Sequence, residues 1–499
     1  MTREGSRRLI RCALPATCLL GMAAPAMADD LRDALVTAYQ TNPTLEAARS
    51  SQRAVDAGVP IARAAGLPSL SGTGTYTEFL QKSANSFTSP DRALDAQANL
   101  SVPLYSGGAV RNSVQAAETR VKAGQGDLRA TESGIFAQVV GAYLDVIRDQ
   151  AIVGLNRNNV QVLEVNLTAT RDRFEIGDLT RTDVAQSQAR LAQARSDLRS
   201  SEAALAGSRE SYIRLVGKPP VDLQPPPPLP GLPASPEEAV QTALDNNPDL
   251  AAARLRSKAA GFDTRVAGAG RLPRISAFSG LDYTNYFSTL GGAASATVMQ
   301  HQTTAQAGIR ATIPLFQGGL PAAQERQAQA REGATLEQEI GTEREVIATV
   351  RTYFQQWKAA NEIIQSSQAA VDAAALGLEG VRAENSVGNR TILDILNAEQ
   401  ELLNTQVVLV RARRNAYVAG FSVLAAMGRA ESRDLGLDGG MLYDPQVNYA
   451  RVRGNIFDWA HDPAPKVHST RTVDTPAQDG SISAKDAPMT VSAMPKTGG

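Results

Sequence analysis

The side chains that could support catalysis or metal binding are few and scattered along the chain. It has three histidines, His301, His461 and His468, and two cysteines, Cys12 and Cys18. None of them stands at zinc-ligand spacing, and the sequence has neither a phosphate-binding glycine loop followed by lysine nor a serine or cysteine nucleophile motif. We therefore expect no enzyme activity, no cofactor and no metal site, and the energy for any transport must come from a partner.

The first 28 residues indicate export. Arg3, Arg7, Arg8 and Arg11 precede the mostly apolar stretch 13–24, and an Ala-x-Ala signal at 26–28 follows. This pattern predicts a signal peptide, 1–28, and the stretch is too short to span a bilayer, which takes roughly 20 residues. Cleavage removes both cysteines and leaves a mature chain without thiol chemistry. Its mild net acidity gives no reason to expect nucleic acid as a partner.

Two very long helices organise the rest of the chain. From 107 to about 171 there is no proline, and apolar residues recur every seven positions, which is a coiled-coil pattern. The residues of this row are Val139, Val146, Val153, Val160 and Leu167. The same row recurs 211 positions later at Val350, Trp357, Ile364, Val371 and Leu378. Each helix would be roughly 100 Å long, so the sequence predicts a duplicated rod.

Each rod is preceded by candidate β-strands. Residues 94–104 alternate apolar and polar over about the length of a tilted strand in a transmembrane barrel, and 305–315 repeat this face after 211 positions. Weaker candidates begin at 69 and cover 274–287. A half-buried strand of a soluble sheet would look similar in isolation. No later stretch approaches 18 consecutive apolar residues, so we expect no membrane-spanning helix.

The turns and the proline-rich stretch between these elements predict the domain organisation. Short turns at 176–180 and 387–391 lead into return helices at 181–216 and 392–427, so each rod becomes a helical hairpin. We predict a first repeat at 29–218, a proline-rich linker at 219–236 and a second repeat at 237–429. The aperiodic tail, 430–499, is rich in Gly, Pro, Ser and Thr and is expected to be disordered.

Four amphipathic strands per chain cannot close a barrel, and an open sheet edge is not tolerated in lipid. Two chains would supply eight strands, a barrel filled by its own side chains, whereas three would supply twelve and an aqueous lumen. We therefore predict a mixed α and β membrane protein in which a homotrimer forms a twelve-stranded β-barrel. The helices would continue this barrel as a coiled-coil tunnel.

The chain resembles the TolC family of outer-membrane channel proteins over about residues 31–429. The resemblance lies in Asn-Pro breaks at 42–43 and 247–248, in the strand-to-helix joints V-P-L-Y-S-G-G and I-P-L-F-Q-G-G, and in the turns I-G-D-L-T-R-T-D and S-V-G-N-R-T-I-L-D-I-L. Each motif is weak alone, but all of them occur in order and in duplicate.

This resemblance implies a trimeric channel in the bacterial outer membrane that extends through the periplasm. It also implies contact with outer-membrane lipid, docking to a periplasmic adaptor (membrane fusion) protein and an inner-membrane RND or ABC transporter. The function it implies is the exit duct of a tripartite efflux pump or a type I secretion system. Drugs, heavy metals and secreted proteins all remain open as cargo.

The resemblance also implies two sets of site residues at the helical tips. The adaptor would contact the two turns, Ile176, Gly177, Asp178, Leu179 and Thr180 with Val387, Gly388, Asn389, Arg390 and Thr391. The pore would be narrowed and latched by Asp183, Arg390 and Asp394. Asn385 stands where the family has a tyrosine and Asn397 where it has a second acid, which predicts a weaker latch and a less charged ring. The plainer alternatives are glycines that only serve tight turns and a solvated aspartate.

A non-porous exported coiled-coil protein, such as a periplasmic adaptor or a surface adhesin, is the alternative reading. Adaptors also contain helical hairpins. They would not need four strands with matched apolar faces, so the strands favour the channel.

Overall fold

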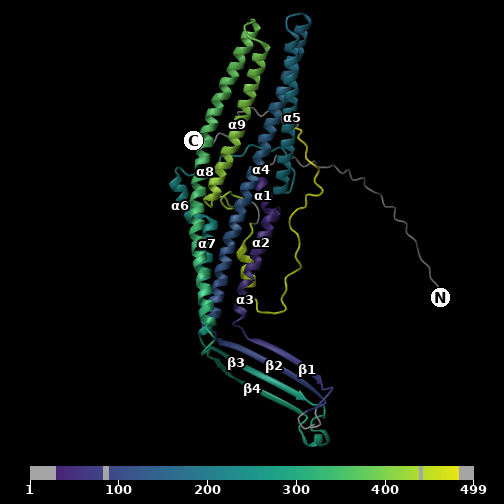
Figure 1. Cartoon of the computed structure of the whole chain (residues 1–499), viewed down its shortest axis with the longest axis vertical. Helices are drawn as coiled ribbons and strands as arrows, with labels where there is room; N and C mark the ends of the chain where they lie inside the picture. The colour runs from purple at the N-terminus through teal and green to yellow at the C-terminus, as the bar shows by residue number, and fades with distance from the viewer. Residues whose placement is uncertain (1–29, 83–88, 438–441, 483–499) are drawn as a thin grey trace, which may run out of the picture.

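A computed structural model describes residues 30–82, 89–437 and 442–482. The predicted signal peptide, 1–28, lies outside the described residues. The molecule is a long rod with a β-sheet at one end and two helical tips at the other (Figure 1). Its length comes from α4 (Ala109–Glu175) and α8 (Leu320–Ser386), two helices of 67 residues each. At 1.5 Å per residue each spans about 100 Å, as the heptad spacing predicted.

The two halves share one order of elements: short helices, two strands and a long helical hairpin. The first half comprises α1 (Leu31–Thr41), α2 (Pro43–Asp56), α3 (Gly58–Ala64), β1 (Ser69–Glu78), β2 (Arg92–Tyr105), α4 and α5 (Arg181–Val216). The second comprises α6 (Pro236–Asn246), α7 (Pro248–Gly268), η1 (Ala269–Arg271), β3 (Arg274–Asn285), η2 (Gly292–Thr297), β4 (His301–Thr312), α8 and α9 (Ile392–Ala426). A short helix, α10 (Pro445–Val452), follows.

Asparagine and proline together make the break before α2 and the matching break before α7. The side-chain oxygen of Asn42 accepts a hydrogen bond from the backbone N–H of Thr44 at 2.9 Å, and Pro43 is the first residue of the new helix. Asn247 caps α7 in the same way. A capping side chain followed by a residue with no N–H ends one helix and begins the next at low cost.

The four strands form one antiparallel sheet in the order β1-β2-β3-β4. Leu70 pairs with Leu100, and Ala98 pairs with Leu281, so the apolar residues of neighbouring strands share one face. The opposite face is polar, and there Thr284 donates a hydrogen bond to Asp95 at 2.8 Å. Leu70 is 76% exposed in the single chain, so this apolar face is not buried against any other part of it.

The helices pack along the rows that the heptads predicted. α4 packs against α5 and α8 against α9, while α7 lies between α4 and α8 and α2 lies along α4 (Figure 1). The first seam row is buried throughout, and in the second Val350, Val371 and Leu378 are buried. The largest core cluster surrounds the middle of α4, where Phe136, Tyr143 and Tyr212 are fully buried.

The C-terminal segment differs from the prediction of a disordered tail. Over the described residues 430–437 and 442–482 it includes α10, which packs on α2, and then an extended stretch beside α5 (Figure 1). Arg209 Nη1 donates to the carbonyl of Asp479 at 2.7 Å, and Ile482 is buried in the main core cluster. The prediction is therefore wrong for these residues. Lack of periodicity argues against long helices, but it does not stop an extended chain from bonding to helices already formed.

Candidate functional site

Both predicted turns lie at the end of the molecule opposite the sheet (Figure 1). Gly177 has φ +85° and Gly388 has φ +84°, a left-handed conformation that ends α4 and α8. Only glycine adopts it without a steric penalty, so the glycines serve the turns as expected. Ile176 and Val387, just before them, are 80% and 71% exposed. The tips thus present an apolar side chain each to the surroundings.

The two aspartates that the resemblance placed at the pore constriction both belong to capping boxes. Asp183 Oδ2 accepts hydrogen bonds from the N–H and hydroxyl of Thr180 at 2.9 and 2.7 Å. Asp394 does the same with Thr391, at 2.9 and 2.8 Å. Each threonine hydroxyl in turn accepts from the aspartate N–H at 3.3 Å. These reciprocal bonds start α5 and α9.

The capping bonds keep both carboxylates ionised. The hydroxyl and backbone N–H of Thr180 lower the pKa of Asp183 below its ordinary value. The N–H and hydroxyl of Thr391 lower the pKa of Asp394 likewise, and Arg390 adds a smaller attraction. Hydrogen bonds donated to a carboxylate favour its charged form. Each tip therefore carries a fixed negative charge near its helix start.

The other predicted tip residues form a local network within the second turn. Arg390 Nε donates to Glu384 Oε2 at 2.6 Å, and Asn385 Nδ2 donates to the carbonyl of Arg390 at 2.7 Å. In the first turn the corresponding ion pair joins Arg173 to Asp178 at 2.6 Å. Asn385 thus supports the conformation of its own turn.

Asn397 makes a contact between the two hairpins. Its side-chain oxygen accepts a hydrogen bond from Arg190 Nη2, on α5, at 2.8 Å. Asp183 is not brought to the second tip: across the described residues, its side chain hydrogen-bonds only to Thr180. The single chain therefore joins α5 to α9 through Asn397 but leaves the two capping aspartates apart.

Sequence reasoning missed a buried polar connection between the hairpins. Glu399, on α9, accepts hydrogen bonds from Arg382 of α8 at 2.9 Å and from Asn166 of α4 at 3.1 and 3.0 Å. Its side chain is only 5% exposed. The available signal was a charged residue four positions after Ile395, on the apolar face of α9. Such a residue needs a buried partner.

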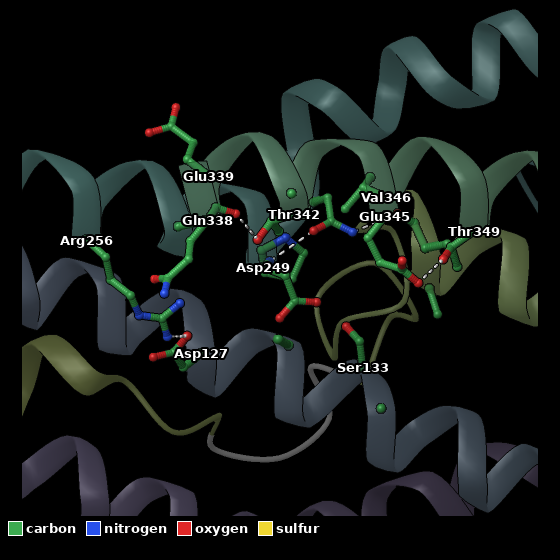
Figure 2. A pocket seen from close by; sticks show the side chains of 18 of the residues that line it. Asp127, Ser133, Asp249, Arg256, Gln338, Glu339, Thr342, Glu345, Val346 and Thr349 are labelled. Carbon is green, nitrogen blue, oxygen red and sulfur yellow. Dashed lines mark hydrogen bonds and ion pairs between the residues drawn. The ribbon is translucent and has the colours of Figure 1, made fainter. Parts of the chain in front are cut away.

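A cavity of about 930 Å³ lies in the helical wall where α9 ends and α7 begins, between α4 and α8 (Figure 2). Asp249 and Ser133 are directed into it, and Arg256 pairs with Asp127 at its edge (Figure 2). Burial raises the pKa of Asp249, and nearby Asp127 adds to the rise. In the part of the chain that the structure describes, the buried Ser133 hydroxyl has no hydrogen-bond partner. The lining combines these polar side chains with small apolar ones such as Ala130 and Ala253.

Over the described ranges, no three or more His, Cys, Asp or Glu side chains are grouped so that they could hold a metal ion. Within the same described ranges, none of the helices has the length and apolar character needed to cross a membrane.

Comparisons with known proteins agree with this geometry. Residues 34–218 and 239–429 match the family described as outer membrane efflux protein. The outer membrane efflux protein BepC of Brucella suis is 32% identical over 445 residues, which cover 89% of this chain and 94% of BepC. The outer membrane protein TolC of Vibrio cholerae is 25% identical over 418 residues, covering 82% of this chain and 92% of TolC.

A solved structure shares the fold. The CmeC outer membrane channel of Campylobacter jejuni superimposes with a TM-score of 0.71 at 16% sequence identity, over 86% of this chain and 90% of that one. The predicted fold class, four strands per chain continued by long helical hairpins, is confirmed by this likeness and by the sheet and helices described above.

Proposed function

This chain belongs to the outer membrane efflux protein family and is an outer-membrane channel that extends into the periplasm, and we propose that three copies of it form one exit duct. The family consists of transport channels, and the TolC-type resemblance predicted from the motifs is thereby confirmed. We further propose that this chain has no enzyme activity and that an inner-membrane transporter supplies the energy.

The trimer is supported by the two flanks of the single chain, both of which lack a packing partner within the described residues. The sheet ends at β1 on one side and at β4 on the other, and an open edge is not tolerated in lipid. The helical layer has matching open flanks: Ile61 on α3 is 72% exposed, and Leu336 and Ile340 on α8 are about half exposed. Pairing β4 of one copy with β1 of the next would cover both flanks and give twelve strands.

The two faces of the sheet suit such a barrel. The apolar face, with Leu70, Leu100 and Leu281, would meet lipid, and the polar face, with Asp95 and Thr284, would line a water-filled lumen. Beyond the sheet, toward the tips, α2, α4, α7 and α8 lie side by side and would continue the wall as a tunnel. A non-porous coiled-coil protein would not need a sheet with one apolar and one polar face.

We propose that the tips serve two roles at the periplasmic end. The exposed side chains of Ile176 and Val387 offer an apolar contact to an adaptor protein. Three symmetry copies of Asp394, kept ionised by Thr391, would form a ring of negative charge that attracts cations and repels anions. The adaptor in turn would couple the duct to an RND or ABC transporter for efflux or type I secretion.

Single-channel recording tests this function. The purified protein, inserted in a planar bilayer, should give a small cation-selective conductance, and unheated samples should migrate as a trimer. A well-folded protein that is extracted without detergent and gives no conductance would contradict the proposal. That result would favour the adaptor or adhesin class instead.

A further inference from the structure

Three large apolar side chains are exposed together in one loop of the C-terminal segment. Ile456 is 72% exposed, Phe457 68% and Trp459 83%. We call residues 453–461, which follow α10, the tail loop. Isolated exposed apolar residues are ordinary, but three within four positions form a patch of the kind that marks an interaction site.

The tail loop lies at the level where the helices meet the sheet. Tyr449 of α10 packs against Val59 of α3, and Arg63 Nη1, near the end of α3, donates to the carbonyl of Arg453 at 2.8 Å. Strand β1 begins six residues after Arg63. Figure 1 shows the yellow C-terminal segment descending beside α3 to this junction and then turning back along α5.

The tail loop is held in shape by its own contacts. Arg451, just before it, pairs with Asp462, just after it, through two bonds of 2.5 and 2.9 Å. Inside the loop, Phe457 N donates to Asn455 Oδ1 at 3.0 Å, and Ala460 N donates to the carbonyl of Phe457 at 3.0 Å. A pre-organised loop loses less conformational freedom on binding than a flexible one.

We infer that the tail loop inserts Ile456, Phe457 and Trp459 into the periplasmic leaflet of the outer membrane. This inference rests on the proposed function, because it takes the sheet to span that membrane. Aromatic side chains gather at both water–lipid interfaces of membrane barrels, and tyrosine and tryptophan suit this position because each joins an apolar ring to a polar O–H or N–H group. At the far end of the sheet Tyr76 and Phe287 form such a pair, with ring centres 6.3 Å apart.

The tail loop supplies the corresponding aromatic groups at the end of the sheet next to the helices, level with the start of β1. Arg453 is the first residue of the tail loop and Arg63 lies beside it, and their positive charges suit the phosphates of a lipid headgroup layer. A phospholipid surface is therefore the occupant that fits its position, its aromatic character and these two cations.

Depth-dependent fluorescence quenching tests the inference. The chain has two tryptophans, so Trp357→Phe leaves Trp459 as the reporter. The full-length trimer is reconstituted into phospholipid vesicles whose lipids carry bromine either near the headgroup or near the bilayer centre. Trp459 should be quenched, more strongly by the shallow bromines, and shielded from aqueous iodide. The control is Trp459→Phe in an otherwise wild-type chain. Its remaining tryptophan, Trp357, packs against the helical core and should not respond to the lipid bromines.

Two other results would overturn the inference. Trp459 open to iodide and unquenched by lipid would place the tail loop in water. Trp459 shielded from iodide yet unquenched by lipid would place it against a neighbouring copy. The variant Leu281→Trp on the apolar sheet face, in a background lacking both natural tryptophans, separates this failure from failure of the channel itself. If that reporter is quenched and Trp459 is not, only the tail loop inference falls.

Hydrogen exchange gives a second readout without any substitution. Amides of the tail loop should exchange at least roughly tenfold more slowly in lipid bilayers than in amphipathic polymer, because insertion suppresses local opening. Val467 and Val473 are 77% and 80% exposed further along the same segment and provide a matched internal control. Equal exchange of the tail loop in both media would contradict insertion.

Discussion

The carboxylate of Glu399, on α9, lies 2.9 Å from the guanidinium of Arg382, on α8, and is almost fully buried. The same carboxylate reaches Asn166 on α4, so one side chain joins the two hairpins. A buried charge that loses its partners is costly, and this connection is therefore a strong constraint on how far the tips can separate.

Replacing Glu399 by alanine should loosen the tips. We expect Glu399→Ala to increase the single-channel conductance and to lower the free energy of unfolding by about 1 kcal/mol, because Arg382 and Asn166 both lose a bond. Glu401→Ala, at an exposed position on the same helix, is the control. Conductance equal to that of the wild type would show that this network does not restrict the pore.

Neutralising the proposed charge ring should reduce ion selectivity. Asp394→Asn removes three negative charges from a trimer, while the amide oxygen can still accept the capping bonds from Thr391. The reversal potential across a salt gradient should move toward zero. Asp197→Asn, on α5, makes the same change of net charge and should leave selectivity intact. Unmoved selectivity in Asp394→Asn would remove this residue from the constriction.

The capping bonds should set the pH at which selectivity is lost. Since Thr391 lowers the pKa of Asp394, the ring stays charged as the pH falls past the ordinary aspartate value of 3.8. Its contribution is present above that value and disappears only as the pH falls through the lower folded pKa. Thr391→Val removes the hydroxyl donor, so the midpoint should move to higher pH. Reversal potentials measured against pH check this, and an unchanged midpoint would contradict it.

Glu132 should make the protein more stable in mild acid. Burial raises the pKa of this carboxyl, which accepts a hydrogen bond from Ser432 N at 2.6 Å. A raised folded pKa adds stability that is fully present below the unfolded value and is lost as the pH rises through the folded one. Thermal unfolding at pH 7.5 and 4.5 should show this gain for the wild type and a smaller one for Glu132→Gln. Glu175→Gln, exposed on the same helix, should behave like the wild type.

Two glycines in the second half should respond oppositely to alanine. Gly388 has φ +84°, so Gly388→Ala should destabilise the tip by about 1 kcal/mol. Gly377 lies inside α8 with open space around it, so Gly377→Ala should stabilise the helix by up to about 1 kcal/mol. Denaturant unfolding measures both changes. Shifts of the same sign would contradict the assigned turn geometry.

Much of the architecture could be predicted because it follows from short-range patterns. The seven-residue rows of α4 and α8, the alternation in β2 and β4 and the Asn-Pro breaks each reflect the geometry of a single element. The duplication strengthened every assignment, because the same pattern recurred at one shift. The tip turns were readable for the same reason, since Gly177 and Gly388 follow directly from the local backbone they require.

The roles of particular polar residues were harder to predict from the sequence. The resemblance pointed to Asp183 and Asp394 as pore residues, but their capping bonds with Thr180 and Thr391 emerged only from the structure. The ordered path of the C-terminal segment was also missed. Its order comes from contacts such as Arg63 with Arg453, which lie 390 positions apart and leave no periodic trace.

Periodicity, capping and turn chemistry act within a few residues, so the amino-acid sequence was enough to define the helix lengths, the two faces of the strands and the repeat. Which polar groups meet was settled by packing. Glu399 bonds to Asn166, which is 233 positions away in the sequence, and to Arg382, which is 17 positions away. Both contacts form because two hairpins lie side by side in one register. That register depends on the summed shape of many side chains, and no local pattern records it.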